Sequence, residues 1–390
     1  MSILDCQGQQ NAVLRLQRAL RGQRVPHSYI FHGPEGVGKS LLARQWAKLL
    51  LCPQPVRLNE IDDCCDQCHD CRMVEADTHP DLHIINRDLA RFTSQKRTRQ
   101  LVNLPIDVIR EFVIKPAGVV PNRGRARVFI IEESETMNPA SQNALLKTLE
   151  EPPPETFLIL ITSHPERFLP TVRSRCQSVR FGPLPYTFIS EKLTAAGVPA
   201  EQVRYWADFC NGRLGPALEL AQMNLYEKKC QLIEQLANLN YYSALDVAAW
   251  IVDQAKEFAR SYQKQRQEAP ADNAKKPGPA KKKGGRSRES GQPLTSPTRL
   301  GQTYFLQMLS HAFSETLRFH GRQEQENPQS VNPESARQIA QIAQKYSPWA
   351  CAKAVRATAR TEGLLQANVN PSLLFESLMI AYMDCAALRE

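Results

Sequence analysis

The chain has 390 residues and a formal net charge of +9, from 49 basic and 40 acidic side chains. That length exceeds what one hydrophobic core usually organises, so we expect two or three domains. Apolar residues make up 42% and charged residues 23%, which excludes a wholly disordered or fibrous chain. No apolar run reaches the roughly 18 residues of a membrane-spanning helix, and the first residues lack the basic and apolar pattern of a secretory signal. We therefore expect a cytoplasmic protein without membrane contact.

The first 182 residues alternate between helix and strand patterns. Helical spacing falls at 10–22, 41–51, 105–115 and 141–149, and short apolar runs typical of buried parallel strands fall at 29–32, 128–131 and 157–161. Residues 84–103 are polar and are expected to form an insertion. Strands that alternate with helices predict an α/β layered domain over residues 1–182.

Beyond Pro183 only helix patterns remain. They cover 186–222, 224–262, 302–321, 334–346, 348–367 and 371–388. We expect a small helical domain at 183–240 and a larger helical domain at 241–390.

Most of the excess charge lies in residues 264–300. Ten basic and three acidic side chains give this segment +7 and leave +2 for the rest of the chain. The segment is rich in Pro, Gly, Ser and Lys and has almost no apolar residues, so it cannot offset the entropy of ordering itself. We interpret it as a disordered basic insertion, which is either a solvated linker or an arm that contacts nucleic acid.

Residues 33–40, GPEGVGKS, match the phosphate-loop pattern GxxxxGK[ST] between a predicted strand and a predicted helix. Glycines let backbone amides turn inward around phosphates, and the helix start adds its positive end. Lys39 would reach the β- and γ-phosphates of ATP, and Ser40 would hold Mg²⁺. The alternative is a glycine turn with an incidental lysine.

Two acids follow the predicted strand 128–131, at the strand end where α/β sites lie. The first position is usually an aspartate that orients the magnesium shell, but here it is Glu132. Glu133 would act as the catalytic base that polarises water. The alternative is a solvated strand end. We expect ATP to bind and its hydrolysis by this chain to be weak or absent.

Five of the eleven cysteines lie between residues 52 and 71. Cys65, Cys68 and Cys71 are each separated by two residues, and such short loops let thiolates converge on one tetrahedral ion. Without an export signal a disulfide framework is disfavoured. We expect a zinc site at Cys52, Cys65, Cys68 and Cys71. Cys64 is then surplus, and His69 is an alternative ligand.

Four motifs in this order resemble the clamp-loader subunits of bacterial DNA polymerase III. They are the phosphate loop, the cysteine group, NALLKTLEEPP at 143–153 and SRC at 174–176, and NVNPSL at 368–373 extends the likeness to the C-terminal part. The resemblance implies a RecA-like AAA+ domain, a helical lid and a helical collar. It also implies a hetero-pentameric ring with other clamp-loader subunits, which loads the sliding clamp onto primed DNA.

The resemblance also assigns residues. It places the nucleotide at Gly33, Gly36, Gly38, Lys39, Ser40, Glu132 and Thr162, and the zinc at the four cysteines. It makes Arg175 of SRC an arginine finger that acts on a neighbouring subunit's γ-phosphate, the alternative being a surface salt bridge. Thr162 or Ser163 would sense the nucleotide, the alternative being a hydroxyl that caps the strand.

The lid motif of the motor subunits reads GSxRxAL, and Gly215 stands here at the arginine position. Together with Glu132 this indicates the delta-prime type of subunit, and the alternative is a gamma/tau-like motor ATPase of the same complex. A stand-alone nucleotide kinase with a zinc lid would leave SRC and the helical C-terminal part unexplained.

Overall fold

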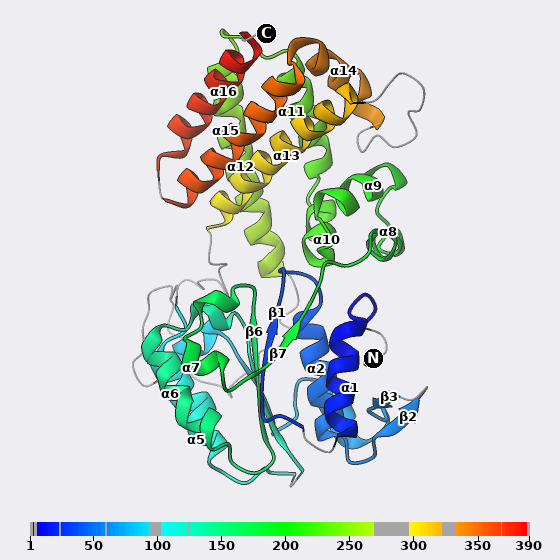
Figure 1. The fold of residues 1–390 in the computed structure, drawn as a ribbon, viewed down its shortest axis with the longest axis vertical. Coiled ribbons are helices and arrows are strands. Elements are labelled where there is room, and N and C mark those ends of the chain that lie inside the picture. Colours follow the sequence, from blue (N-terminus) through cyan, green and yellow to red (C-terminus); the bar gives the residue numbers. More distant parts are fainter. Residues whose placement is uncertain are drawn as a thin grey trace. The chain divides into compact units, whose positions relative to one another are not determined.

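The computed structural model of the chain, drawn in Figure 1, describes residues 3, 6–22, 25–58, 61–93, 103–123, 125–268, 296–321, 333–367 and 369–387. Most of the predicted basic insertion (269–295), residues 94–102 of the predicted polar insertion and Asn368 lie outside this part. The chain divides into two compact units, Met1–Glu191 with Asn211–Pro216 and Lys192–Cys210 with Ala217–Glu390. The predicted domain boundaries at residues 182 and 240 stay predictions.

A five-stranded parallel sheet organises the first unit. Its strands are β4 (Leu82–Ile85), β5 (Arg127–Ile131), β6 (Thr156–Thr162), β1 (Ser28–His32) and β7 (Gln177–Arg180), in that spatial order. All neighbouring pairs are parallel, with Phe31 opposite Ile161 and Ile130 opposite Ile159. Every residue of β5 and β6 is buried, as fully apolar runs predict.

Helices cover both faces of this sheet (Figure 1). They are α1 (Gln10–Arg21), α2 (Lys39–Leu51), α4 (Ile106–Ile109) continuing through the π turn η3 (Arg110–Ile114) into α5 (Lys115–Ala117), α6 (Pro139–Glu150) and α7 (Pro170–Arg173). Alternate residues of β1 face opposite sides, since Tyr29 packs on Trp46 of α2 while Ile30 joins the core under α4, α6 and α7.

The sequence patterns missed several short elements. β4 overlaps the start of the predicted polar insertion, and the 3₁₀ helix η2 (Arg87–Phe92) follows it. The pattern missed β4 because His83 interrupts its otherwise apolar run LHII. The segment that follows Cys52 contains the hairpin of β2 (Val56–Leu58) and β3 (Ile61–Asp63) and leads into α3 (His69–Glu75). The prediction of an insertion from residue 84 is thus wrong for the residues of β4.

The remaining elements are helices. They are α8 (Tyr186–Ala195), α9 (Ala200–Phe209), α10 (Leu214–Gln222), α11 (Leu225–Ala237), α12 (Ala244–Glu268), α13 (Pro297–His320), α14 (Ala336–Lys345), α15 (Pro348–Gln366) and α16 (Pro371–Ala387). In the second unit the ring of Phe313 packs on those of Tyr346 and Tyr382 at centroid distances of 5.2 and 4.7 Å. The parallel sheet and the helices after it confirm the predicted α/β fold class with a helical C-terminal part. Among the described helices, none is both long and apolar enough to cross a lipid bilayer.

A buried ion pair fixes the loop that precedes β5. Asp81 accepts hydrogen bonds from the amides of Asn122 and Arg123, both at 2.8 Å, and from the guanidinium of Arg127 at 3.0 Å. Arg127 also donates to the carbonyl of Val119 at 2.9 Å. The side chain of Asp81 is fully buried and that of Arg127 is 4% exposed. Each buried charge is therefore compensated by the other.

We predict that Asp81→Asn lowers the free energy of unfolding by about 3–5 kcal/mol near pH 7, because it leaves the buried guanidinium uncompensated. Burial alone would raise the pKa of Asp81, but the hydrogen bonds from Asn122, Arg123 and Arg127 lower it below 3.8. The carboxylate therefore stabilises the fold fully above pH 3.8, and this contribution is lost as the pH falls through the lower folded-state pKa. Urea unfolding at pH 7 and pH 3 measures both effects.

The matched control is Glu166→Gln, which removes a carboxylate that is 67% exposed in a pair with His164. A much smaller change is expected there, because an exposed ion pair contributes little to stability. An equal loss in both variants would contradict the role of the buried pair.

Candidate functional site

The phosphate-loop sequence forms the turn between β1 and α2. Gly36 and Gly38 have φ of 76° and 95°, a left-handed region that side chains disfavour, and α2 begins at Lys39 directly after Gly38. The carbonyls of residues 36, 37 and 38 accept hydrogen bonds from donors beyond the loop. A trans peptide points its C=O and the following N–H in opposite directions, so the amides of residues 37–39 face the concave side. That is the arrangement that cradles phosphate.

Lys39 is buried inside this turn. Its ammonium donates to the carbonyls of Gly33 and Pro34, both at 2.6 Å, and to the hydroxyl of Ser163 at 3.2 Å. Burial lowers the pKa of Lys39 to about 8, against the opposing attraction of Glu135 and Glu35. An anionic phosphate beside this ammonium would favour its charged form. Ser40, the predicted magnesium ligand, lies exposed on the first turn of α2.

The two candidate sensor hydroxyls after β6 have different partners. Thr162 is buried, and its Oγ1 accepts a hydrogen bond from the amide of His164 at 2.9 Å. Ser163 accepts one from Lys39. The geometry therefore gives Thr162 a contact within the turn that follows the strand, and gives Ser163 the contact with the phosphate-loop lysine. The role of Thr162 in nucleotide binding stays a prediction.

Glu132 and Glu133 follow β5, as the sequence predicts. Burial raises the pKa of both carboxyl groups. Glu133 has a left-handed backbone with φ of 47°, and its carboxylate pairs with Arg87 of η2 at 2.5 Å. Sequence reasoning missed Arg87, because nothing in the sequence pairs η2 with the end of β5. As a base Glu133 would have to exchange this partner for water.

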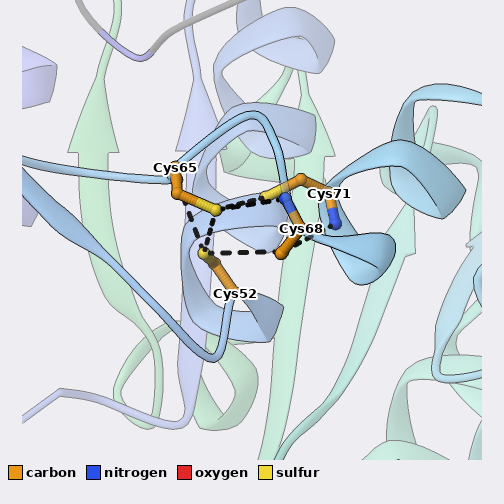
Figure 2. A group of neighbouring side chains, drawn as sticks. All are labelled: Cys52, Cys65, Cys68 and Cys71. Atoms are coloured by element: carbon orange, nitrogen blue, oxygen red, sulfur yellow. Dashed lines mark hydrogen bonds between the residues drawn. The ribbon is translucent and has the colours of Figure 1, made fainter.

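The four predicted metal-ligating cysteines converge (Figure 2). Their sulfurs all lie within 4.8 Å of one another, and Cys52 lies 3.6 Å from Cys65 and 4.0 Å from Cys68. Sulfurs bound at 2.3 Å around one tetrahedral ion are about 3.8 Å apart. The group can therefore hold one metal ion without rearrangement. Cys52 follows α2, while the other three belong to the turn before α3 and to its first residues.

Backbone amides donate to three of these sulfurs and favour the thiolate form at Cys65, whereas burial raises the pKa of Cys52 and Cys71. The amides of Cys65, Cys68 and Cys71 donate to the sulfurs of Cys52, Cys65 and Cys68 at 3.5, 3.4 and 3.3 Å. Burial alone would raise the pKa of Cys65, but hydrogen bonds from the amides of residues 67 and 68 lower it to about 7. Deprotonated sulfur is the form that binds metal.

The two other candidate ligands lie outside the group. The thiol of Cys64 donates to Asp66 at 3.3 Å, and burial raises its pKa to about 12. His69 is exposed at the start of α3. Neither belongs to the set of four converging sulfurs, among the residues that the structure describes.

Arg175 of the SRC motif lies on the surface after α7. Its guanidinium donates to the carbonyl of Thr171 at 2.9 Å and pairs with Glu150, the last residue of α6, at 2.7 Å. The side chain is 36% exposed. The salt bridge that the sequence offered as an alternative is therefore present in the single chain, and neither Thr171 nor Glu150 belongs to the phosphate loop.

We predict that Gly36→Ala destabilises the chain by at least about 1–2 kcal/mol, the cost of a left-handed backbone for a residue with a side chain. A Cβ there would also lie 2.4 Å from Cδ of Pro216. Gly118→Ala is the control, since Gly118 has φ of −75° and a Cβ there would lie at an ordinary contact distance of 3.7 Å from the carbonyl oxygen of Lys115. This variant should be neutral or slightly stabilising. Urea unfolding compares the two; equal effects would refute the strain at Gly36.

The relatives described below are all subunits of DNA polymerase III. Residues 8–185 match the family model described as "DNA polymerase III, delta subunit". The DNA polymerase III subunit delta' of Pseudomonas aeruginosa is 33% identical over 219 residues, which are 55% of this chain and 61% of that protein. The delta' subunit of Bacillus subtilis is 30% identical over 56% of this chain and 61% of that protein.

The tau/gamma subunit of Haemophilus influenzae is 35% identical over 201 residues, 50% of this chain and 27% of that protein. The matched part of the chain thus spans about three fifths of the two delta' relatives. Residues 8–185, which contain the parallel sheet, the phosphate loop and the four cysteines, are similar to the DNA polymerase III delta-subunit family.

Proposed function

We propose that this chain is a delta-prime-like subunit of a DNA polymerase III clamp loader. In this role it joins other loader subunits in a hetero-pentameric ring that loads the sliding clamp onto primed DNA. The observation that carries the proposal is Gly215, which stands where the motor subunits have the lid arginine, in a chain whose residues 8–185 match the delta-subunit model. The delta' relatives of two bacteria support this type of subunit.

The proposed nucleotide is ATP with Mg²⁺. The inward amides of residues 37–39 and the ammonium of Lys39 would hold the phosphates, and Ser40 would hold the magnesium. Glu132 and Thr162 would complete the site. Ser163, which already contacts Lys39, is the alternative nucleotide-sensing hydroxyl.

Three features support weak hydrolysis by the chain itself. Glu132 replaces the aspartate that usually orients the magnesium shell, and Glu133 is paired with Arg87. Gly215 supplies no guanidinium near the phosphates. A gamma/tau-like motor ATPase is the second candidate, favoured by the intact phosphate loop and the tau/gamma relative.

Arg175 would act in trans. Its contacts lie with Glu150 and Thr171 and not with the phosphate site of its own chain. The exposed pair with Glu150 is weak enough to be exchanged for a neighbour's phosphate. A guanidinium that reaches a transferred phosphoryl group stabilises its charge and can raise the rate by ~10³–10⁵.

We propose that the four-cysteine group binds Zn²⁺ as a structural ion. Four thiolates with closed coordination and no position for water are typical of structural zinc sites. The ion would tie the end of α2 to α3 and would stabilise the hairpin between them.

We predict that Arg175→Ala lowers ATP turnover of the assembled loader at least tenfold and leaves ATP binding by this chain unchanged. The reason is that the guanidinium would complete a neighbouring site and not its own. The measurement is steady-state ATPase of the ring reconstituted with the other loader subunits, together with nucleotide titration of the isolated chain.

Arg173→Ala is the matched control, because Arg173 is an exposed arginine two residues away at the end of α7. It should leave ring turnover near the wild-type value. Unchanged turnover with Arg175→Ala would refute the action in trans, and motor-like turnover by the isolated chain would refute the delta-prime assignment.

We also predict that the purified chain contains one zinc ion and that Cys68→Ser removes it. Cys64→Ser is the control, because the Cys64 thiol bonds to Asp66 outside the group. Elemental analysis of the chain and both variants decides the matter. Native protein without metal, or equal loss from both variants, would end the assignment.

A further inference from the structure

Gln9, the residue before α1, has a side-chain amide whose nitrogen makes two hydrogen bonds and whose oxygen makes one. Its amide nitrogen donates to the carbonyl of Gly182 at 2.8 Å and to that of Val37 at 3.2 Å. Its amide oxygen accepts from the backbone N–H of Gly182 at 3.1 Å. Gln9 is only 5% exposed. The orientation of the amide is determined, because the flipped form would set its oxygen against two carbonyl oxygens.

The bond to Val37 reaches the phosphate loop from outside. It holds the carbonyl of Val37 away from the concave side, and the planar trans peptide then turns the N–H of Gly38 toward that side. The backbone N–H of Gly215 acts in the same way on the carbonyl of Gly36, at 3.2 Å. Two successive peptide planes of the loop thus owe their orientation to donors that lie outside it.

Gly182, the other partner of Gln9, lies two residues beyond the end of β7, and β7 pairs with β1. Gln9 therefore connects the N-terminal segment, the exit of the edge strand and the phosphate loop within one compact unit. A side chain of this kind stabilises the orientation of a peptide without contacting what the peptide binds.

We propose that Gln9 is a positioning residue for nucleotide binding, which acts by orienting the peptide between Val37 and Gly38. This inference rests on the proposed function, since it presupposes that the loop receives phosphate. Removing the donor frees the peptide to rotate and leaves a buried carbonyl without its partner. Nucleotide affinity then falls, because the binding amide is no longer held in place before the phosphate arrives.

The chain offers a matched control in Gln17 of α1. Gln17 is 2% exposed, donates to the carbonyl of Asp62 at 2.7 Å and accepts from the N–H of the same residue at 2.8 Å. Asp62 belongs to β3 and not to the phosphate loop. Both glutamines therefore bridge to the backbone of a distant segment, but only Gln9 reaches the loop.

The experiment compares Gln9→Met and Gln17→Met in the full chain. Methionine preserves most of the volume and removes all of the hydrogen bonds. Titration with Mg·ADP carrying a fluorescent group on the ribose gives the dissociation constant, and thermal unfolding gives Tm. We expect similar losses of Tm, but a dissociation constant raised about tenfold, equivalent to ~1.4 kcal/mol, only for Gln9→Met.

A third variant, Gln9→Glu, removes both donated hydrogen bonds of Gln9 and keeps the accepted one. Its carboxylate can still accept from the N–H of Gly182 but can donate to the carbonyl of neither Val37 nor Gly182. It should weaken ADP binding at least as much as Gln9→Met. Wild-type affinity in either Gln9 variant, or an equal loss of affinity in Gln17→Met, would overturn the proposal.

Hydrogen exchange separates failure of this proposal from failure of the proposed function. If the wild-type chain does not bind ADP, nucleotide binding itself is refuted, and the amides of residues 36–40 still report on positioning. Faster exchange there in Gln9→Met, but not in Gln17→Met, supports the role of Gln9. Equal exchange in the two variants overturns it.

Discussion

The parallel pairing of β1 between β6 and β7 is the constraint on which the proposed nucleotide site depends. Carboxyl ends of parallel strands meet at one edge of a sheet, so the loop after β1, Ser163 after β6 and Gly182 after β7 come together there. The contacts of Lys39 with Ser163 and of Gln9 with Gly182 follow from this pairing. A site of this kind is a property of strand order first and of individual side chains second.

The cysteine group lies in a segment of the same unit that is too small to have a hydrophobic core of its own. Residues 52–75 form two three-residue strands and a short helix, which have too little apolar surface for a core of their own. Four converging sulfurs with amide hydrogen bonds supply the missing cohesion if they share an ion. The module lies next to Lys48 of α2, whose buried ammonium pairs with Asp66 and Glu75. The module is therefore held against α2 by ion pairs as well as by the continuous chain.

Much of this arrangement could be predicted from the sequence, because the strongest signals are local. The phosphate loop and the cysteine spacing are contained in short runs, and the buried strands β5 and β6 contain the apolar runs 128–131 and 157–161. The missed features are those that depend on distant partners. β7 carries polar residues on an edge, His83 interrupts β4, and the pair of Arg87 with Glu133 joins segments 46 residues apart. No local pattern distinguishes Gln9 from Gln17, since only the fold determines which carbonyls each one meets.

Gly215, which has no side chain, makes a close backbone contact with the phosphate loop. Its N–H bonds to the carbonyl of Gly36, and a Cβ on Gly215 would lie 3.3 Å from the Cα of Gly36. A Cβ on Gly36 would collide with Pro216. The segment Asn211–Pro216 and the phosphate loop therefore meet backbone to backbone, at a distance that larger side chains would disturb. An arginine at this position would need more room between the two. Gly215 therefore gives this segment a backbone contact with the phosphate loop at the position where the motor-type pattern would carry an arginine side chain.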